Sequence, residues 1–557
     1  MVQRRPTLSV VPAAQRPAAF TGRHQMGRVR TGAPARAVLA AGLASLLAAI
    51  STAPAGAAPL GPAGNSVSPI ALGLNTAPWD YVYAAPVSSG GGEDVIQPLL
   101  KGAGIDMMRY GGGSYADYYD WSTNTDIQTC IWGNPYGTFT GAPAPYDTTA
   151  PFTGASCDNT DSLDFDQFST QAKAVGAQSM VTVNYGSGTP AEAAAWVSHS
   201  LTTSGDSVAL WEVGNENYGC WEVNNWLAQA PENYQGYQPN NYSSPGNATC
   251  PQTTQGNATG TQTLATSYAV NARRFLLAMK GADRSAQIGV PWAFGSGVGG
   301  ASVPDNTEWN NTVLGRDGDL VNFVDAHYYP FSFGGATGGS NPTDQQVLES
   351  LMAVPSLYQQ IRSELNAYDP KAKVVVGETN VSNNETTTVC TPTGALFAAG
   401  DVLSWLAAGA ETVAWWDMNN YGNSGSTCVN SDYGMFTSGS PPVPETPYYG
   451  YVLASLVAQP HAFLSALPTS DPDDVLGYQS VLPNGHGAVA FINTNTASAE
   501  TVTFHPDLPL GGDLKTWTYS AGSQNSTNSQ IVQGSASRSS VAHGITLPAE
   551  SMVVLAS

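Results

Sequence analysis

The sequence predicts an α/β fold, a (β/α)8 TIM barrel followed by a C-terminal antiparallel β-sandwich. The first observation is that short apolar runs alternate with helical patterns from about residue 70 to residue 460. The second is that this pattern changes, after residue 462, to short alternating runs without a long helical pattern. The third is the length, since 557 residues suit one barrel-sized domain plus a smaller one.

Residues 1–57 are predicted to form a secretory signal peptide. They hold seven Arg and no acidic residue, an apolar run at residues 35–50, and a small-residue cleavage pattern at residues 55–57. The apolar run is shorter than the roughly 20 residues of a membrane span, although an uncleaved N-terminal anchor is the alternative. We therefore expect a secreted, extracellular protein that has no membrane partner after cleavage.

Residues 58–460 are predicted to form the barrel. Its eight near-continuous apolar runs are typical of a parallel sheet covered by helices, and they span residues 71–75, 107–111, 180–185, 210–215, 288–292, 324–329, 374–378 and 412–417. The helical patterns between them span residues 93–101, 163–174, 191–200, 266–279, 345–368 and 395–408. These eight units favour a barrel with long βα loops, and a doubly wound sheet is the alternative.

Residues 461–557 are predicted to form the β-sandwich. The expected strands are residues 476–481, 488–493, 501–504, 515–519 and 552–555. Asn484 and Gly485, between the first two of them, are a strong signal for a hairpin. Residues 58–70 are a candidate for one further strand of this domain.

The charge balance and the cysteines restrict the partners and the compartment. The net charge is −22, and without the seven leading Arg the chain has 13 Lys+Arg against 42 Asp+Glu, a net charge of −29. An acidic protein of this kind argues against nucleic acid as a partner. Six cysteines in an oxidising compartment suggest disulfides, and sequential pairing is the simplest of 15 arrangements: Cys130 with Cys157, Cys220 with Cys250, and Cys390 with Cys428.

Two glutamates stand at the ends of predicted strands, where a TIM barrel carries its catalytic groups. Glu216 follows the fourth strand and Glu378 ends the seventh. Burying a carboxylate directly after an apolar run costs free energy, so its presence there indicates a function. Two carboxyl groups that face each other across a cleft are the catalytic groups of glycoside hydrolysis. The alternative is that both are ordinary acids in loops or at helix N-termini. We expect them to form a catalytic pair.

This pattern resembles the clan A retaining glycoside hydrolases, whose signature is Asn-Glu after strand four and Glu at the end of strand seven. Asn215, Glu216 and Glu378 match it. The resemblance implies that Glu216 is the general acid/base, that Glu378 is the nucleophile, and that Asn215 bonds the 2-hydroxyl of the sugar. It also implies that the substrate is an oligosaccharide or polysaccharide.

Further substrate-binding residues follow from the same resemblance. Arg109, on the second strand, looks like the Arg that this clan places beside the nucleophile. His327 and Tyr329, on the sixth strand, are similar to the pair that orients the nucleophile, and alternation along the strand favours Tyr329 over Tyr328 on the face of His327.

Flat aromatic rings at strand ends are candidates for stacking on sugars: Trp79, Tyr185, Trp292 and Trp416. Of Trp415 and Trp416, we expect one in the core and one in a subsite.

Within the clan, the motifs most resemble those of family 51 α-L-arabinofuranosidases. The likeness lies in the strand-two motif at residues 109–121 and in the loop after strand three at residues 184–196. Gly111 stands where that family usually has Pro, and Gly377 and Thr379 flank Glu378 where it usually has Asp and Trp. These departures leave the sugar open, because families 39, 44 and 79 share the same skeleton.

The sequence therefore predicts a secreted retaining glycoside hydrolase of plant or microbial polysaccharide, most similar to α-L-arabinofuranosidases, that uses no cofactor and no metal. The alternatives are another clan A activity (β-xylosidase, β-glucuronidase, endo-glucanase or galactanase) and a non-catalytic carbohydrate-binding protein of the cell surface. The acidity favours a neutral sugar polymer. A GxGxxG match at residues 295–300 is set aside, because polar sequence rather than a helix is expected after it.

Overall fold

The computed structural model describes residues 64–80, 83, 92–126, 159–205, 208–219, 222, 264–294, 306–331, 342–382, 387–419, 433–439, 441–506, 508, 510–520, 531–541 and 543–557. All of them belong to one compact unit, Gly61–Ser557. The predicted signal peptide, the GxGxxG match and five of the six cysteines lie outside the described residues. Cys390 is described and is not a free thiol, and the three pairings stay predictions.

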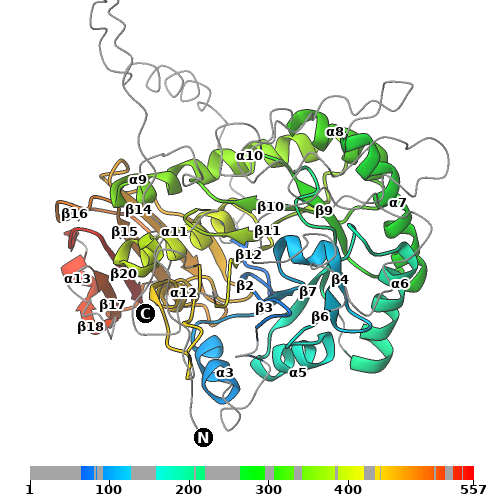
Figure 1. The fold of residues 1–557 in the computed structure, drawn as a ribbon. Helices are drawn as coiled ribbons and strands as arrows, with labels where there is room; N and C mark the ends of the chain where they lie inside the picture. The colour runs from blue at the N-terminus through cyan, green and yellow to red at the C-terminus, as the bar shows by residue number, and fades with distance from the viewer. Residues whose placement is uncertain are drawn as a thin grey trace, which may run out of the picture. The chain divides into compact units, whose positions relative to one another are not determined.

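Eight parallel strands close into a barrel in which each strand pairs with its neighbours in the sequence (Figure 1). They are β2 (Leu72–Asn75), β3 (Met107–Tyr110), β7 (Gln178–Val183), β8 (Leu210–Val213), β9 (Ile288–Trp292), β10 (Phe323–Tyr328), β11 (Lys373–Thr379) and β12 (Thr412–Trp415). Closure comes from the pairing of β12 with β2, where Val413 lies opposite Leu72. The predicted barrel is confirmed, and this pairing excludes the doubly wound sheet.

Helices follow most of the barrel strands and cover the outside of the barrel (Figure 1). The α-helices are α3 (Glu93–Gly102), α5 (Phe165–Val175), α6 (Pro190–His199), α7 (Leu264–Ala282), α8 (Asn306–Asp317), α9 (Asp344–Glu349), α10 (Val354–Leu365), α11 (Pro392–Ala408) and α12 (Thr446–Ser455). Short stretches of 3-10 or π-helix add η3 (Gly113–Tyr118), η4 (Ser200–Ser204), η7 (Ser350–Ala353) and η8 (Thr387–Cys390). A small antiparallel sheet contains β4 (Tyr119–Asp120), β5 (Thr125–Asp126) and β6 (Asn159–Thr160).

Three features of the helical layer differ from the prediction, one of which is that α12 was not expected. The single helix expected over residues 345–368 is divided into α9, η7 and α10. Pro355 stands in the first turn of α10, a position that proline favours; because it has no backbone N–H, it interrupts the ladder of helical hydrogen bonds there. Helix α8 was not expected, because its sequence is mostly polar and contains three apolar side chains, Trp309, Val313 and Leu314, all of which are buried.

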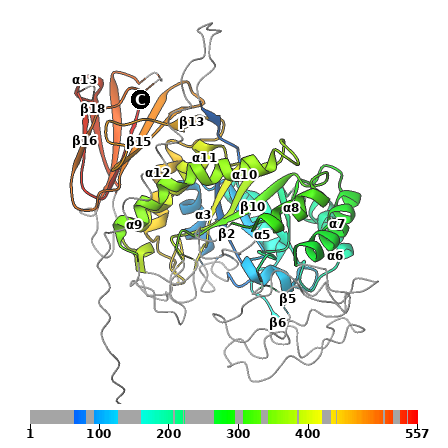
Figure 2. The same cartoon turned by 90° about the horizontal axis from the view of Figure 1, so that it is seen from above.

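The C-terminal part is a two-layered β structure, which confirms the predicted sandwich (Figure 2). The larger sheet has the order β1 (Asn65–Ser66), β13 (Phe463–Ala466), β14 (Val475–Val481), β15 (Gly487–Asn493), β20 (Ser551–Ala556), β17 (Asp513–Ser520) and β18 (Val532–Ser537). The smaller one pairs β16 (Glu500–Val502) with β19 (Ile545–Leu547), and the short helix α13 (Arg538–Val541) follows β18. Asn484 and Gly485 lie in the β14–β15 hairpin, as predicted.

Each face of the larger sheet contacts a different core. Phe491 and Val553 on one face pack with Val502 of the smaller sheet. Tyr478 on the other face packs with the barrel helices, and its hydroxyl lies 2.6 Å from the Ser404 hydroxyl of α11. Among the described residues, no helix is both long and apolar enough to cross a membrane.

The alternation of side chains along the barrel strands explains where polar groups enter the barrel. The lower interior is apolar and includes Met107, Met180, Leu210 and Phe323. Because side chains two positions apart on a strand share a face, the next inward residues are Arg109, Thr182, Glu212 and Asp325. They form a polar layer directly above the apolar one, and the candidate site is built on it.

Candidate active site

Arg109 lies at the centre of the site and is fully buried. Its Nη1 donates to Asn75 Oδ1 at 2.9 Å and to Glu378 Oε1 at 2.7 Å. Its Nη2 donates to Glu212 Oε2 and to Asn215 Oδ1, both at 2.9 Å. One guanidinium therefore links β2, β3, β8 and β11, and its planar fork suits the paired acceptors.

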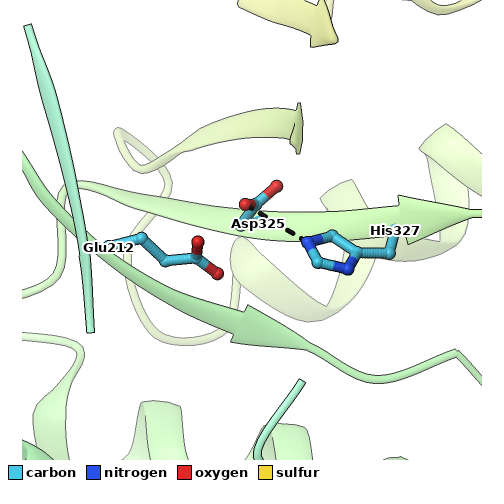
Figure 3. A group of neighbouring side chains, drawn as sticks. All are labelled: Glu212, Asp325 and His327. Carbon is cyan, nitrogen blue, oxygen red and sulfur yellow. Dashed lines mark ion pairs between the residues drawn. The ribbon is translucent and has the colours of Figure 1, made fainter. Parts of the chain in front are cut away.

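Beneath the site, Glu212, Asp325 and His327 lie together although they come from two separate strands, β8 and β10. Figure 3 shows the Glu212 side chain pointing toward the other two. Asp325 Oδ2 lies 3.5 Å from His327 Nε2, and Thr182 donates to Glu212 Oε2 at 2.8 Å. Burial, and then the negative charge of Asp325, raise the pKa of Glu212 above its ordinary value despite the nearby Arg109.

Glu378 reaches the site through an irregularity in β11. Asp325 pairs with Val375, but His327 pairs with Glu378, so the register shifts by one residue between them. Gly377 lies at this shift; its N–H donates to Asp325 Oδ1 at 2.5 Å, and a Cβ there would overlap the Asp325 carboxylate. The shift places Glu378 beside His327, where Tyr329 also donates to Glu378 Oε2 at 2.8 Å. The structure thus brings Glu378, His327 and Tyr329 together.

Glu216 stands in the turn that follows β8. Gly214 has a φ of +75° and Glu216 itself a φ of +43°, so the chain turns sharply here. The Glu216 side chain is 13% exposed, and its Oε1 accepts from the Tyr218 hydroxyl at 3.0 Å. The turn therefore presents a nearly buried carboxyl group at the upper end of the barrel strands.

His327 brings the two predicted catalytic carboxyl groups together. Its Nδ1 lies 3.0 Å from Glu216 Oε1 and 3.4 Å from Glu378 Oε2. One oxygen of Glu216 and one of Glu378 lie within 4.8 Å of each other. Burial alone would lower the pKa of His327, but the charge of Glu378 and the bonds to Asp325 and Glu216 outweigh it and hold that pKa well above its ordinary value. The surrounding carboxyl groups therefore favour the protonated form of the His327 imidazole.

Asn215, buried beside Arg109, has two partners that the sequence did not reveal. Its Nδ2 donates to Glu222 Oε1 at 3.1 Å, and its backbone N–H lies 3.4 Å from Asp117 Oδ2. Asp117 also accepts from Asn217 Nδ2 at 2.7 Å. All of these side chains are buried. The end of β8 therefore carries a polar network in addition to Glu216.

The four predicted aromatic residues divide into two groups. Trp79 and Trp416 are partly exposed, and a Cβ on Gly113 would contact the Trp416 ring. Tyr185 is buried against Tyr268 and Phe275 of α7, with ring centroids 4.8 and 5.6 Å apart. Trp292 is a buried member of the main hydrophobic core, as is Trp415. The structure therefore leaves only Trp79 and Trp416 of the four available for a ligand.

Sequence reasoning missed Asp117, Glu212, Glu222 and Asp325. The prediction from sequence was limited to the ends of the predicted strands, whereas Glu212 and Asp325 lie inside β8 and β10. A signal existed for these two, because a carboxylate inside an apolar strand is costly without a partner. No comparable signal marks Asp117 or Glu222, because neither lies on a barrel strand and their place depends on the loops.

Two groups at the site, Glu212–Asp325–His327 and Glu216–His327–Glu378, have ligand atoms close enough for a metal ion. Their donor sets do not suit one, because Arg109 donates to both Glu212 and Glu378 and its charge would repel a cation. A third group, Asp471, Asp474 and Glu500, lies in the sandwich and is partly exposed.

The fold is similar to those of solved glycoside hydrolases. The family 51 arabinofuranosidase of Xanthomonas axonopodis pv. citri matches with a TM-score of 0.61 and 16% identity, over 88% of this chain and 97% of that chain. The thermostable family 51 α-L-arabinofuranosidase of Thermotoga petrophila matches with a TM-score of 0.61 and 15% identity, over the same shares. A family 44 xyloglucanase of Paenibacillus polymyxa matches with a TM-score of 0.52 and 12% identity, over 87% and 99%.

No protein-family model matches the sequence, and no curated protein matches it. At identities of 12–16% the structural matches show a shared fold. What the chain does must therefore be argued from its own site.

Proposed function

We propose that this protein is a retaining glycoside hydrolase, with Glu378 as nucleophile and Glu216 as general acid/base. The observation that carries the proposal is the meeting of the two carboxyl groups around His327, with oxygens within 4.8 Å of each other. Retaining enzymes hold their carboxyl groups about 5–5.5 Å apart, whereas inverting enzymes leave about 6.5–9.5 Å for a water molecule. The short separation favours the retaining route.

The surroundings of the two groups suit these different roles. Arg109 and Tyr329 each donate to one oxygen of Glu378, which orients that carboxylate and stabilises its negative charge. Glu216 has different neighbours: its Oε1 accepts from the Tyr218 hydroxyl and lies 3.0 Å from His327 Nδ1. His327 can pass a proton to Glu216 or receive one from it, because the distance of 3.0 Å is that of a hydrogen bond.

The proposed reaction has two displacements. In the first, an oxygen of Glu378 bonds to the anomeric carbon while the glycosidic C–O bond breaks and Glu216 gives its proton to the leaving oxygen. In the second, Glu216 takes a proton from a water molecule, whose oxygen bonds to the anomeric carbon and releases Glu378. The bond at the anomeric carbon is replaced twice, each time with inversion of configuration. The product therefore keeps the anomeric configuration of the substrate.

For the substrate we propose a neutral polysaccharide with terminal α-L-arabinofuranosyl groups. The motifs around Arg109 and the similarity to the two arabinofuranosidases support this choice. Trp79 and Trp416 are the candidate stacking rings, and the acidity of the chain disfavours an anionic polymer. We further propose export of the protein, on the basis of the pattern in residues 1–57, which N-terminal sequencing of secreted material would check.

Aryl glycosides of arabinofuranose, xylose, glucuronic acid and galactose test the proposal. We expect hydrolysis of the arabinofuranoside with retention of the anomeric configuration. NMR of the first-formed sugar measures that configuration. Glu378→Ala should lose about 10⁴-fold or more in kcat, and added azide should restore part of it as the inverted glycosyl azide. The matched surface variant Glu349→Ala should keep full activity. Sugar binding without turnover would support the carbohydrate-binding alternative, and an inverted product would exclude the retaining route.

A further inference from the structure

The side-chain amide of Asn215 is held at both ends. Its Oδ1 accepts from Arg109 Nη2 at 2.9 Å, and its Nδ2 donates to Glu222 Oε1 at 3.1 Å. A guanidinium can only donate, and a carbonyl-type oxygen of a carboxyl group accepts. The two contacts therefore select one of the two flip states of the amide, with its oxygen toward Arg109 and its nitrogen toward Glu222.

Glu222 is itself fixed. Its side chain is buried, with a residue exposure of 2%, and its Oε1 also accepts from the Ser114 hydroxyl at 2.7 Å. Ser114 belongs to η3, the turn that follows β3. A chain of contacts thus runs from the turn after β3, through Glu222, to the amide of Asn215 at the end of β8.

The environment of Glu222 favours its neutral form. Burial, followed by the negative charges of Asp117 and Glu216, raises the pKa of Glu222 well above its ordinary value, and the bonds from Ser114 and Asn215 offset only part of this. A neutral carboxyl group still accepts through its carbonyl oxygen. Glu222 can therefore hold Asn215 without placing a second negative charge beside Glu216.

We propose that Glu222 is a positioning residue, which aligns the amide of Asn215 with the hydroxyl group adjacent to the anomeric carbon of the bound sugar. The amide nitrogen has two hydrogens, and Glu222 accepts one of them, which leaves the other for the sugar. Hydrogen bonds to that hydroxyl strengthen in the transition state of glycoside hydrolysis. This inference rests on the proposed function, and it gives the buried Glu222 carboxyl group a role in the site.

Variants of Glu222 separate positioning from simple packing. Glu222→Ala should lower kcat/KM about 10- to 100-fold, because a misaligned hydrogen bond of 1.4–2.8 kcal/mol is lost from the transition state, and most of the loss should fall on kcat. Glu222→Gln keeps a neutral acceptor for both donors and should stay within about threefold of wild type. Glu222→Leu removes the acceptor at similar volume, so a folding defect of the Ala variant leaves the test intact. Glu349→Ala is the matched control.

A double-mutant cycle with Asn215→Ala gives the decisive readout. Because Glu222 acts through Asn215, the double variant should be no slower than Asn215→Ala alone. The positioning role would be overturned if the activity losses of the two single variants multiplied in the double variant. It would also be overturned if Glu222→Gln were as slow as Glu222→Leu, or if Glu222→Leu had wild-type activity. If wild type hydrolyses none of the aryl glycosides, the proposed function falls as well. If wild type hydrolyses an aryl glycoside but the losses of the two single variants multiply, only the role of Glu222 is overturned and the proposed function stands.

Discussion

At the scale of single residues, the site depends most on the side chain of Arg109. Four hydrogen bonds leave it toward Asn75, Glu212, Asn215 and Glu378. Because all four partners are buried, loss of their shared donor leaves polar groups unsatisfied rather than solvated. The consequences for stability and for activity should therefore appear together.

Arg109→Lys should lower kcat/KM by about 100-fold or more and unfolding free energy by about 3 kcal/mol. The lysine keeps the positive charge but cannot serve four acceptors from one planar group. Arg273→Lys is the control, because Arg273 is partly exposed: it pairs with the exposed Asp319 at 2.8 Å and with the buried Asp317 at 3.4 Å, so a lysine there should cost less than at the fully buried Arg109. Kinetics and thermal unfolding of both variants check this, and equal effects of the two substitutions would contradict it.

Tyr329→Phe removes one hydroxyl that donates to Glu378 and leaves the ring in place. A hydrogen bond to a charged group contributes about 1.5–3 kcal/mol, so kcat should fall about 10- to 100-fold with little change in Tm. Tyr328→Phe is the control on the neighbouring residue, because that hydroxyl donates to the Ser350 carbonyl instead, at 3.2 Å. A larger loss of activity in Tyr328→Phe would show that Tyr329 does not act on the nucleophile.

At the scale of elements, the register shift in β11 decides where the nucleophile stands. Gly377→Ala would force its Cβ against the Asp325 carboxylate, and overpacking of this kind costs about 1–3 kcal/mol. We expect lower Tm and loss of most activity, since Asp325 and Glu378 would both move. Gly281→Ala is the opposite control, because that exposed helical site has free space and alanine should add about 0.5–1 kcal/mol. If Gly377→Ala retained its activity, the register shift in β11 would not be needed for catalysis.

Barrel strands and loops differ in how far the sequence predicts them. The eight barrel strands were predictable, because buried parallel strands are continuous apolar runs; β9 matches its predicted range, residues 288–292, at both ends. Helix α12 and strand β13 were missed, because neither shows a clear alternation of polar and apolar residues. Of the site, strand ends indicated Glu216 and Glu378, and the resemblance to clan A enzymes indicated Arg109. The role of Glu222 depends on loop geometry, which no local pattern encodes.

At the scale of the whole molecule, stability should depend on pH in an unusual direction. Burial raises the pKa of several carboxyl groups to about 7 or 8, among them Asp80, Asp106, Asp161, Asp317 and Asp401. In the unfolded chain they titrate near pH 4. Between these values the folded state holds more protons than the unfolded state, so the stability present at low pH falls as the pH rises. Asp319 acts in the opposite sense, but it is exposed.

We therefore expect a higher Tm at pH 5 than at pH 8, measured by scanning calorimetry at constant ionic strength. The growing negative charge acts in the same direction. Asp401→Asn should make the decline shallower, because its amide oxygen can still accept from Thr379 and no longer titrates. A Tm that increases from pH 5 to pH 8 would contradict the raised pKa values.

The backbone of Glu216 has a consequence for how this sequence can change over time. A φ of +43° is a conformation that glycine adopts freely, whereas an L-residue with a long side chain adopts it at an energetic cost. Selection for folding alone would therefore tend to replace this glutamate, and drift in a lineage that no longer needed the site would do so early. The residue at this position is thus an indicator by which active descendants can be told from inactive ones.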